Sequence, residues 1–130
     1  MIVVDTSAWV EYLRGTGSRE HQVLRSLLAG GAPLATTDVV TMEVLAGAKD
    51  EAHAAKLRRM LAALEPLPVQ SPDFEEAARI HRRCRAAGES VRALTDCLIA
   101  AVAMREDVSV LARDRDFDVI ARHAGLSLEQ

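Results

Sequence analysis

Short runs of aliphatic and β-branched residues alternate along the chain with longer segments of helical periodicity. Residues 2–4 and 108–111 are apolar runs without a period, which is typical of buried strands. Residues 33–36 form a weaker candidate, and so do residues 67–69, whose proline favours a place at a sheet edge. Residues 126–128 are a candidate for a last strand.

The segments between these runs carry apolar residues at helical spacings of three and four. Helix starts and stops are marked by capping residues, prolines and glycines, most strongly at Ser71-Pro72-Asp73. Since helices of this length between strands require parallel pairing, the sequence predicts a three-layer α/β/α domain with a short four- or five-stranded parallel sheet. The predicted helices cover residues 6–13, 19–29, 38–46, 50–64, 71–87, 94–104 and 117–123.

Composition narrows the class of protein. The 130 residues, 49% of them hydrophobic and 27% charged, predict one soluble domain over 1–130 rather than a disordered chain. A net charge of -3 and only 3% aromatic residues argue against a domain that coats nucleic acid by charge or base stacking. No apolar run reaches the length of a membrane span and no basic leader precedes residues 2–4, so we expect a cytoplasmic protein with no membrane partner.

The placement of acidic residues is the most informative chemical feature. Asp5 directly follows the first predicted strand, and Asp114 follows the strand 108–111, with Asp116 two residues later. Because the carboxyl ends of parallel strands meet at one edge of the sheet, Asp5 and Asp114 are expected to lie together if these strands are neighbours. Asp96 begins an otherwise apolar helix, and Glu43 lies inside an apolar run.

A carboxylate on an apolar face must be paired, protonated or bound to a metal ion. Several carboxylates that converge repel one another unless a cation lies between them, and an all-oxygen ligand set selects Mg²⁺ or Mn²⁺. Such ions suit hydrolysis of a phosphodiester by a metal-bound water. Each acid taken alone also fits a local role as a helix cap, a turn former or a partner of the helix dipole.

Four short motifs resemble those of the PIN-domain nucleases, and among these the chain looks like the VapC-type toxins of bacterial toxin–antitoxin pairs. The resemblance extends over nearly the whole chain, and every acidic position of the pattern is kept. The motifs are Val4-Asp5-Thr6-Ser7, Met42-Glu43-Val44-Leu45, Asp96-Cys97-Leu98-Ile99 and Arg113-Asp114-Arg115-Asp116-Phe117.

The resemblance implies a set of functional residues. The metal-binding acids would be Asp5, Glu43, Asp96 and Asp114, with Asp116 as a frequent fifth contributor. Ser7 would support the first acid or a metal-bound water. The family likeness further implies cleavage of RNA with Mg²⁺ or Mn²⁺, a homodimer, and silencing by a cognate VapB-type antitoxin.

Basic and aromatic positions suggest partner surfaces. Arginines outnumber acids between residues 79 and 92, and they predict contact with RNA phosphates or with an acidic antitoxin, although a solvated helix face explains them as well. Trp9, Tyr12 and Leu13 are candidates for antitoxin or dimer contact, with core packing as the alternative. The arginines are Arg79, Arg82, Arg83, Arg85 and Arg92.

The leading hypothesis is a Mg²⁺- or Mn²⁺-dependent endoribonuclease that acts as the toxin of a type II toxin–antitoxin pair. A catalytically silent PIN-fold binding module is the alternative, and it would show no stabilisation by divalent ions. A metal-dependent phosphatase is a third hypothesis, since a strand-end aspartate also serves aspartyl phosphotransfer and would leave a phosphoenzyme.

Overall fold

The computed structural model describes residues 1–130, and its centre is a sheet of four parallel strands in the order β3-β2-β1-β4. At the middle of the sheet, Val3 of β1 pairs with Ala35 of β2 on one side and with Val110 of β4 on the other. The prediction of a short parallel sheet is confirmed. The strands are β1 (Ile2–Val4), β2 (Leu34–Thr36), β3 (Glu65–Pro66) and β4 (Ser109–Leu111).

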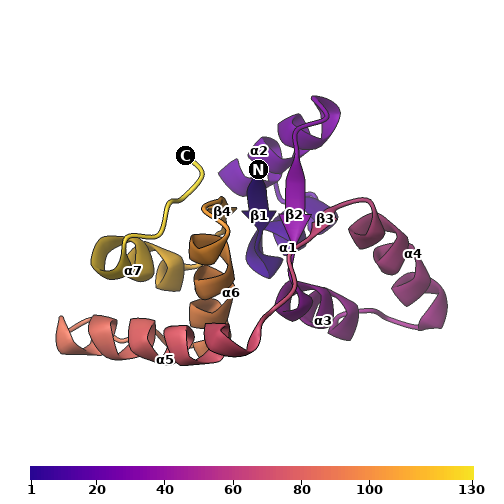
Figure 1. Cartoon of the computed structure of the whole chain (residues 1–130). Helices are drawn as coiled ribbons and strands as arrows, with labels where there is room; N and C mark the ends of the chain where they lie inside the picture. The colour runs from indigo at the N-terminus through magenta and orange to yellow at the C-terminus, as the bar shows by residue number, and fades with distance from the viewer.

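Seven helices complete the three-layer α/β/α arrangement. Figure 1 shows the sheet at the centre, with α5, α6 and α7 gathered on one side and α3 and α4 on the other. None of these helices combines the length and apolar character needed to cross a membrane. The helices are α1 (Thr6–Arg14), α2 (Arg19–Ala29), α3 (Asp38–Ala46), α4 (Glu51–Ala62), α5 (Ser71–Ala86), α6 (Leu94–Arg105) and α7 (Arg115–Ala124).

Capping residues explain where the helices begin and end. The side chains of Asp5, Ser18 and Asp114 each accept a backbone N–H in the first turn of α1, α2 and α7, which satisfies one of the unpaired donors there. Gly15 ends α1 and Gly125 ends α7 with positive φ angles of 62° and 81°, a conformation that glycine adopts at little cost.

Four predicted boundaries need correction, the simplest being that α4 ends at Ala62 and not at residue 64. The third strand lies at Glu65–Pro66 instead of 67–69, because Pro68 has no N–H and the Leu67 N–H makes the last bond to Thr36 O at 2.8 Å. The predicted strand 126–128 is reduced to one bridge between Leu128 and Val110. Helix α7 begins two residues earlier than predicted, since Asp114 is its cap.

The core lies between the sheet and the helices and consists mostly of aliphatic side chains. Helix α6 is buried along most of its length, as its apolar sequence predicts. Trp9 is completely buried, so core packing is the correct interpretation and its proposed role on a partner surface is wrong. Leu13, one turn further along α1, is exposed.

The order of the strands positions the functional edge. Because β1 and β4 are parallel neighbours, the residues that follow them lie side by side, and the Asp5 N–H donates to Leu111 O at 2.9 Å. Asp5 and the Asp114 segment therefore leave the sheet at the same edge, as the sequence predicts.

Candidate metal centre

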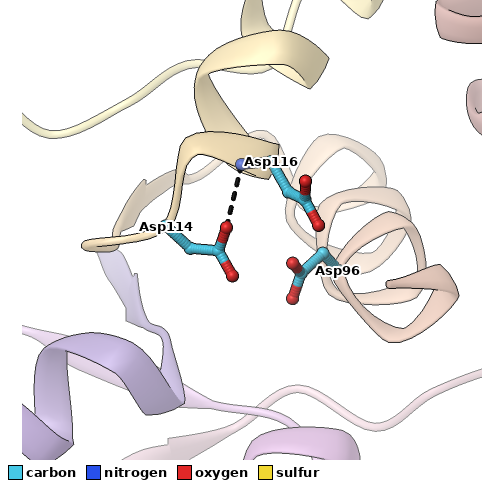
Figure 2. Close-up of side chains that lie close together, drawn as sticks. All are labelled: Asp96, Asp114 and Asp116. Atoms are coloured by element: carbon cyan, nitrogen blue, oxygen red, sulfur yellow. Dashed lines mark hydrogen bonds between the residues drawn. The ribbon is translucent and has the colours of Figure 1, made fainter. Parts of the chain in front are cut away.

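Three carboxylates meet at the edge of the sheet where the parallel strands β1 and β4 end. Asp96 comes from the first turn of α6, Asp114 from the end of the connection after β4, and Asp116 from the first turn of α7. One oxygen atom of each lies within 4.8 Å of the others, and Figure 2 shows the Asp96 carboxylate beside those of Asp114 and Asp116. The Asp116 N–H donates to Asp114 Oδ1 at 2.9 Å, which fixes these two acids relative to each other.

Asp5 lies beside this trio and is held by Ser7. Its Oδ2 atom accepts the Ser7 hydroxyl at 2.6 Å and the Ser7 N–H at 2.9 Å. Burial raises the pKa of the Asp5 carboxyl, the bonds from Ser7 oppose this rise, and the charge of Glu43 adds to it. Ser7 therefore orients the Asp5 carboxyl firmly, but no basic side chain is paired with it.

Asp96 is the electrostatic centre of the cluster. Burial raises its pKa to about 9, and the negative charges of Asp5 and Asp114 contribute to the rise. At neutral pH this carboxyl must therefore hold a proton unless a cation takes the proton's place. The effect of Asp5 on this pKa also shows that Asp5 is in electrostatic contact with Asp96.

Two buried oxygen atoms in this region have no hydrogen-bond partner. They are Asp5 Oδ1 and Asp96 Oδ2, each on a carboxyl group that is almost fully buried. Buried polar atoms are almost always bonded, so atoms left free in this way are expected to bind something that the chain itself does not provide. An all-oxygen set with unused lone pairs fits Mg²⁺ or Mn²⁺ and does not fit zinc, which prefers nitrogen and sulfur.

Asp116 has a second role that the sequence did not reveal. Its Oδ2 atom accepts the backbone N–H groups of Arg92 and Ala93 at 3.1 Å each. These bonds tie the segment before α6 to the first turn of α7, and α6 carries Asp96 in its first turn. Asp116 thus fixes two elements that supply acids to the cluster, in addition to its own place in the trio.

Glu43 lies outside the trio but is connected to Asp5. Its Oε1 atom accepts the Thr6 hydroxyl at 2.8 Å, and Thr6 is the residue next to Asp5. Glu43 also lines a cavity of about 330 Å³ between α1, α3 and α4. The structure therefore connects Glu43 to the acid cluster through Thr6 and through its charge.

The predicted arginines lie on the surface, mostly along α5. Arg79 is paired with Glu76, while the α5 residues Arg82, Arg83 and Arg85 are exposed. Arg92 differs from the others because its Nε atom lies 3.8 Å from Asp116 Oδ1 while 71% of its side chain is exposed.

Sequence reasoning missed three residues that support the cluster. Thr6 stands in the Asp5-Thr6-Ser7 motif, so its place beside Asp5 could have signalled its bond to Glu43. Glu20 and Arg113 form an ion pair between α2 and the residue before Asp114, at 2.8 Å. No sequence signal points to this pair, because an acid in the first turn of a helix already has a local explanation.

Comparison with known proteins identifies close relatives. The PIN domain family model matches residues 2–123. The chain is 47% identical over 128 residues to "Ribonuclease VapC11" of Mycobacterium tuberculosis. This alignment covers 97% of this chain and 96% of that protein. It is 29% identical over 130 residues to "Ribonuclease VapC32" of the same species, with 100% and 98% of the two chains covered.

Solved structures share the fold at lower sequence identity. VapBC2 from Rickettsia felis, bound to a promoter DNA fragment, matches with a TM-score of 0.76 at 22% identity over 99% of this chain and 98% of that one. VapC20 of Mycobacterium tuberculosis, described as a toxin that cleaves the sarcin-ricin loop, matches with a TM-score of 0.73 at 22% identity over 100% and 99% of the two chains.

Proposed function

Because this chain belongs to the PIN-domain family and to its VapC ribonucleases, we propose that it is an endoribonuclease toxin that requires a divalent cation. The observation that carries the cation requirement is the Asp96 carboxyl, which has a pKa of about 9 and a buried oxygen without a partner. A cation beside Asp96 would let all the acids of the cluster ionise together at neutral pH.

The ion would be held mainly by Asp96, Asp114 and Asp116, with Asp5 beside them and Glu43 at the border of the site. When bound, Mg²⁺ or Mn²⁺ supplies positive charge that offsets the negative charge developing on the phosphate and on the leaving oxygen. The chain's own part is to keep the acids in place. The bonds that Asp5 accepts from Ser7 hold its unused Oδ1 atom in a fixed direction.

We propose that RNA approaches past Arg92. This guanidinium stands at the border of the acid cluster and is largely exposed, so it can contact a phosphate that the acids alone would repel. The α5 residues Arg82, Arg83 and Arg85 are exposed as well. They would add sequence-independent attraction for the RNA backbone that weakens as salt is raised.

The partners follow from the same family membership. We propose a cognate VapB-type antitoxin, since the structural neighbours include VapBC complexes, and we propose that the toxin acts in the cytoplasm, where RNA is available. A homodimer would bury the apolar face formed by Phe74 and Leu94, which are 59% and 60% exposed and line one cavity of about 270 Å³.

RNA cleavage with and without a divalent ion tests the proposed function. The wild-type chain should cleave labelled RNA in Mg²⁺ or Mn²⁺ and lose this activity in EDTA. Asp5→Asn should be inactive with an unchanged circular dichroism spectrum, whereas the exposed control Asp118→Asn should cleave normally. Full cleavage by Asp5→Asn in the presence of EDTA would exclude a metal-dependent enzyme.

The homodimer is tested separately by light scattering on the purified toxin. The wild-type chain should have the mass of a dimer, and Leu94→Glu should have that of a monomer, because a charge cannot be buried in an apolar contact. A dimer that survives both Leu94→Glu and Phe74→Glu would show that this face is not the interface.

A further inference from the structure

We infer that Glu20 is a positioning residue for the acid cluster, although it lies on α2 and outside that cluster. Through Arg113 it holds the segment that carries Asp114 and also fixes the hydrogen bond that orients Ser7 toward Asp5. This inference deepens the proposed function, because it assigns a remote residue to the geometry of the proposed cation site.

The first observation is the state of Glu20 itself. Glu20 is only 6% exposed, and its carboxylate is paired with two guanidinium groups. Arg113 Nη1 donates to Glu20 Oε1 at 2.8 Å, and Arg19 Nη1 donates to Glu20 Oε2 at 3.0 Å. The two arginine side chains are 47% and 54% exposed, whereas the carboxylate is buried, so moving Glu20 away would leave its own buried charge unpaired and Glu20 acts as the anchor of the pair.

The second observation is that Arg113 is tied at both its side chain and its backbone. The guanidinium reaches Glu20 on α2, and its Nε atom lies 3.5 Å from Glu11 on α1. The backbone N–H of the same residue donates to Ser7 Oγ at 2.8 Å. Arg113 therefore joins α1, α2 and the connection after β4 at a single point.

The third observation is where these bonds lead. Ser7 Oγ accepts from Arg113 and donates to Asp5 Oδ2 at 2.6 Å, so the Arg113 N–H leaves the hydroxyl hydrogen to point at Asp5. Asp114 is the next residue after Arg113 and belongs to the acid trio. The Glu20–Arg113 pair is thus connected to both Asp5, near the start of the chain, and Asp114, near its end.

Outer residues of this kind change metal affinity when they are altered, typically by about 10-fold to 100-fold. The Glu20 pair could instead serve stability alone, and a matched control separates these roles. Asp73 is likewise a buried acid bonded to an arginine, since Arg105 Nε donates to its Oδ1 at 2.9 Å, and it belongs to no part of the acid cluster.

The experiment measures Mn²⁺ binding by titration calorimetry on the full chain, without RNA. Glu20→Gln should weaken Mn²⁺ binding by about 10-fold, while Asp73→Asn should bind Mn²⁺ like the wild type even if it melts at a lower temperature. Equal Mn²⁺ affinity in Glu20→Gln and the wild type would overturn the inference. If Glu20→Gln does not fold, Arg113→Lys serves in its place, because it keeps the charge but not the guanidinium fork.

Amide hydrogen exchange at Arg113 gives a readout that does not depend on metal or activity. In metal-free protein, Glu20→Gln should speed exchange of the Arg113 N–H by about 10-fold relative to amides of α5, because its bond to Ser7 is loosened. Asp73→Asn should not change this ratio. An unchanged ratio in Glu20→Gln would refute the positioning role. A wild-type chain that binds Mn²⁺ but does not cleave RNA would count against the proposed function and not against the positioning role.

Discussion

Two buried aspartates at opposite ends of α6 show how differently the same residue can be used. Asp96, at the start of α6, is 6% exposed, and Asp73, which contacts the end of α6, is 3% exposed. Burial alone would raise the pKa of both carboxyls. At Asp73 the bonds from Arg105 outweigh burial and lower the pKa, whereas at Asp96 the neighbouring acids add to it and the pKa reaches about 9.

The difference lies in what each acid is given as a partner. Arg105 donates to both oxygens of Asp73, at 2.9 and 3.1 Å, and also to Pro68 O, so this site is fully satisfied from within the chain. Asp96 has Asp5 and Asp114 as neighbours and an oxygen with no partner. Low solvent exposure by itself therefore does not reveal a ligand site, whereas burial among like charges with unused oxygens does.

Cleavage of RNA should separate the two aspartates by the largest margin. Asp96→Asn removes a proposed ligand of the cation and should lower the cleavage rate by at least about 100-fold. Asp73→Asn should cleave at close to the wild-type rate at a temperature where it is folded. Comparable losses in the two variants, measured on the same labelled RNA, would remove the distinction between them.

Stability should separate them in the opposite direction. Asp73→Asn leaves Arg105 with Glu106 as its remaining charged partner and should cost about 3 kcal/mol, which is a fall of about 10 °C in Tm. Asp96→Asn removes the free-energy cost of keeping this carboxyl protonated in the folded, metal-free protein, so it should leave the metal-free Tm unchanged or higher. Calorimetric melting in EDTA measures both, and a lower Tm for Asp96→Asn than for Asp73→Asn would contradict the comparison.

The pH dependence of stability should show a smaller contrast. Without a cation, folded Asp96 keeps a proton that the unfolded chain releases above the ordinary value of 3.8, so its contribution falls as pH rises toward about 9. The slope is at most about 1.4 kcal/mol per pH unit. Asp73 acts oppositely, because its lowered pKa gives stability above its ordinary value that is lost as pH falls below it.

Urea unfolding in EDTA from about pH 5 to about pH 8 measures this slope. The wild-type chain should lose stability across this range more steeply than Asp96→Asn, while Asp73→Asn should keep the wild-type slope. Identical slopes in the wild type and Asp96→Asn would mean that Asp96 holds no proton in the folded, metal-free protein.

Much of the fold could be predicted because local signals and burial agree. The apolar runs at β1 and β4 and the caps Ser18 and Asp5 are strong, and these elements lie where the sequence predicts. The third strand was misplaced by two residues, because its pairing depends on which backbone N–H groups remain available beside Pro68. That is a tertiary effect that no local pattern records.

The site was predictable only as far as strand order brings residues together. The neighbouring carboxyl ends of β1 and β4 made the approach of Asp5 and Asp114 a consequence of topology. The bond from Thr6 to Glu43 spans 37 residues and that from Arg113 to Glu20 spans 93, so neither is visible as spacing in the chain. The roles of the predicted acids as metal ligands stay a prediction.

The central claim is that the acids at the carboxyl edge of the sheet share a cation, and its most direct test is a crystal of this protein soaked in Mn²⁺. The anomalous difference map should show a peak in contact with Asp96 and Asp114, with Asp5 beside it. A map with manganese bound elsewhere and none between these carboxylates would contradict the account.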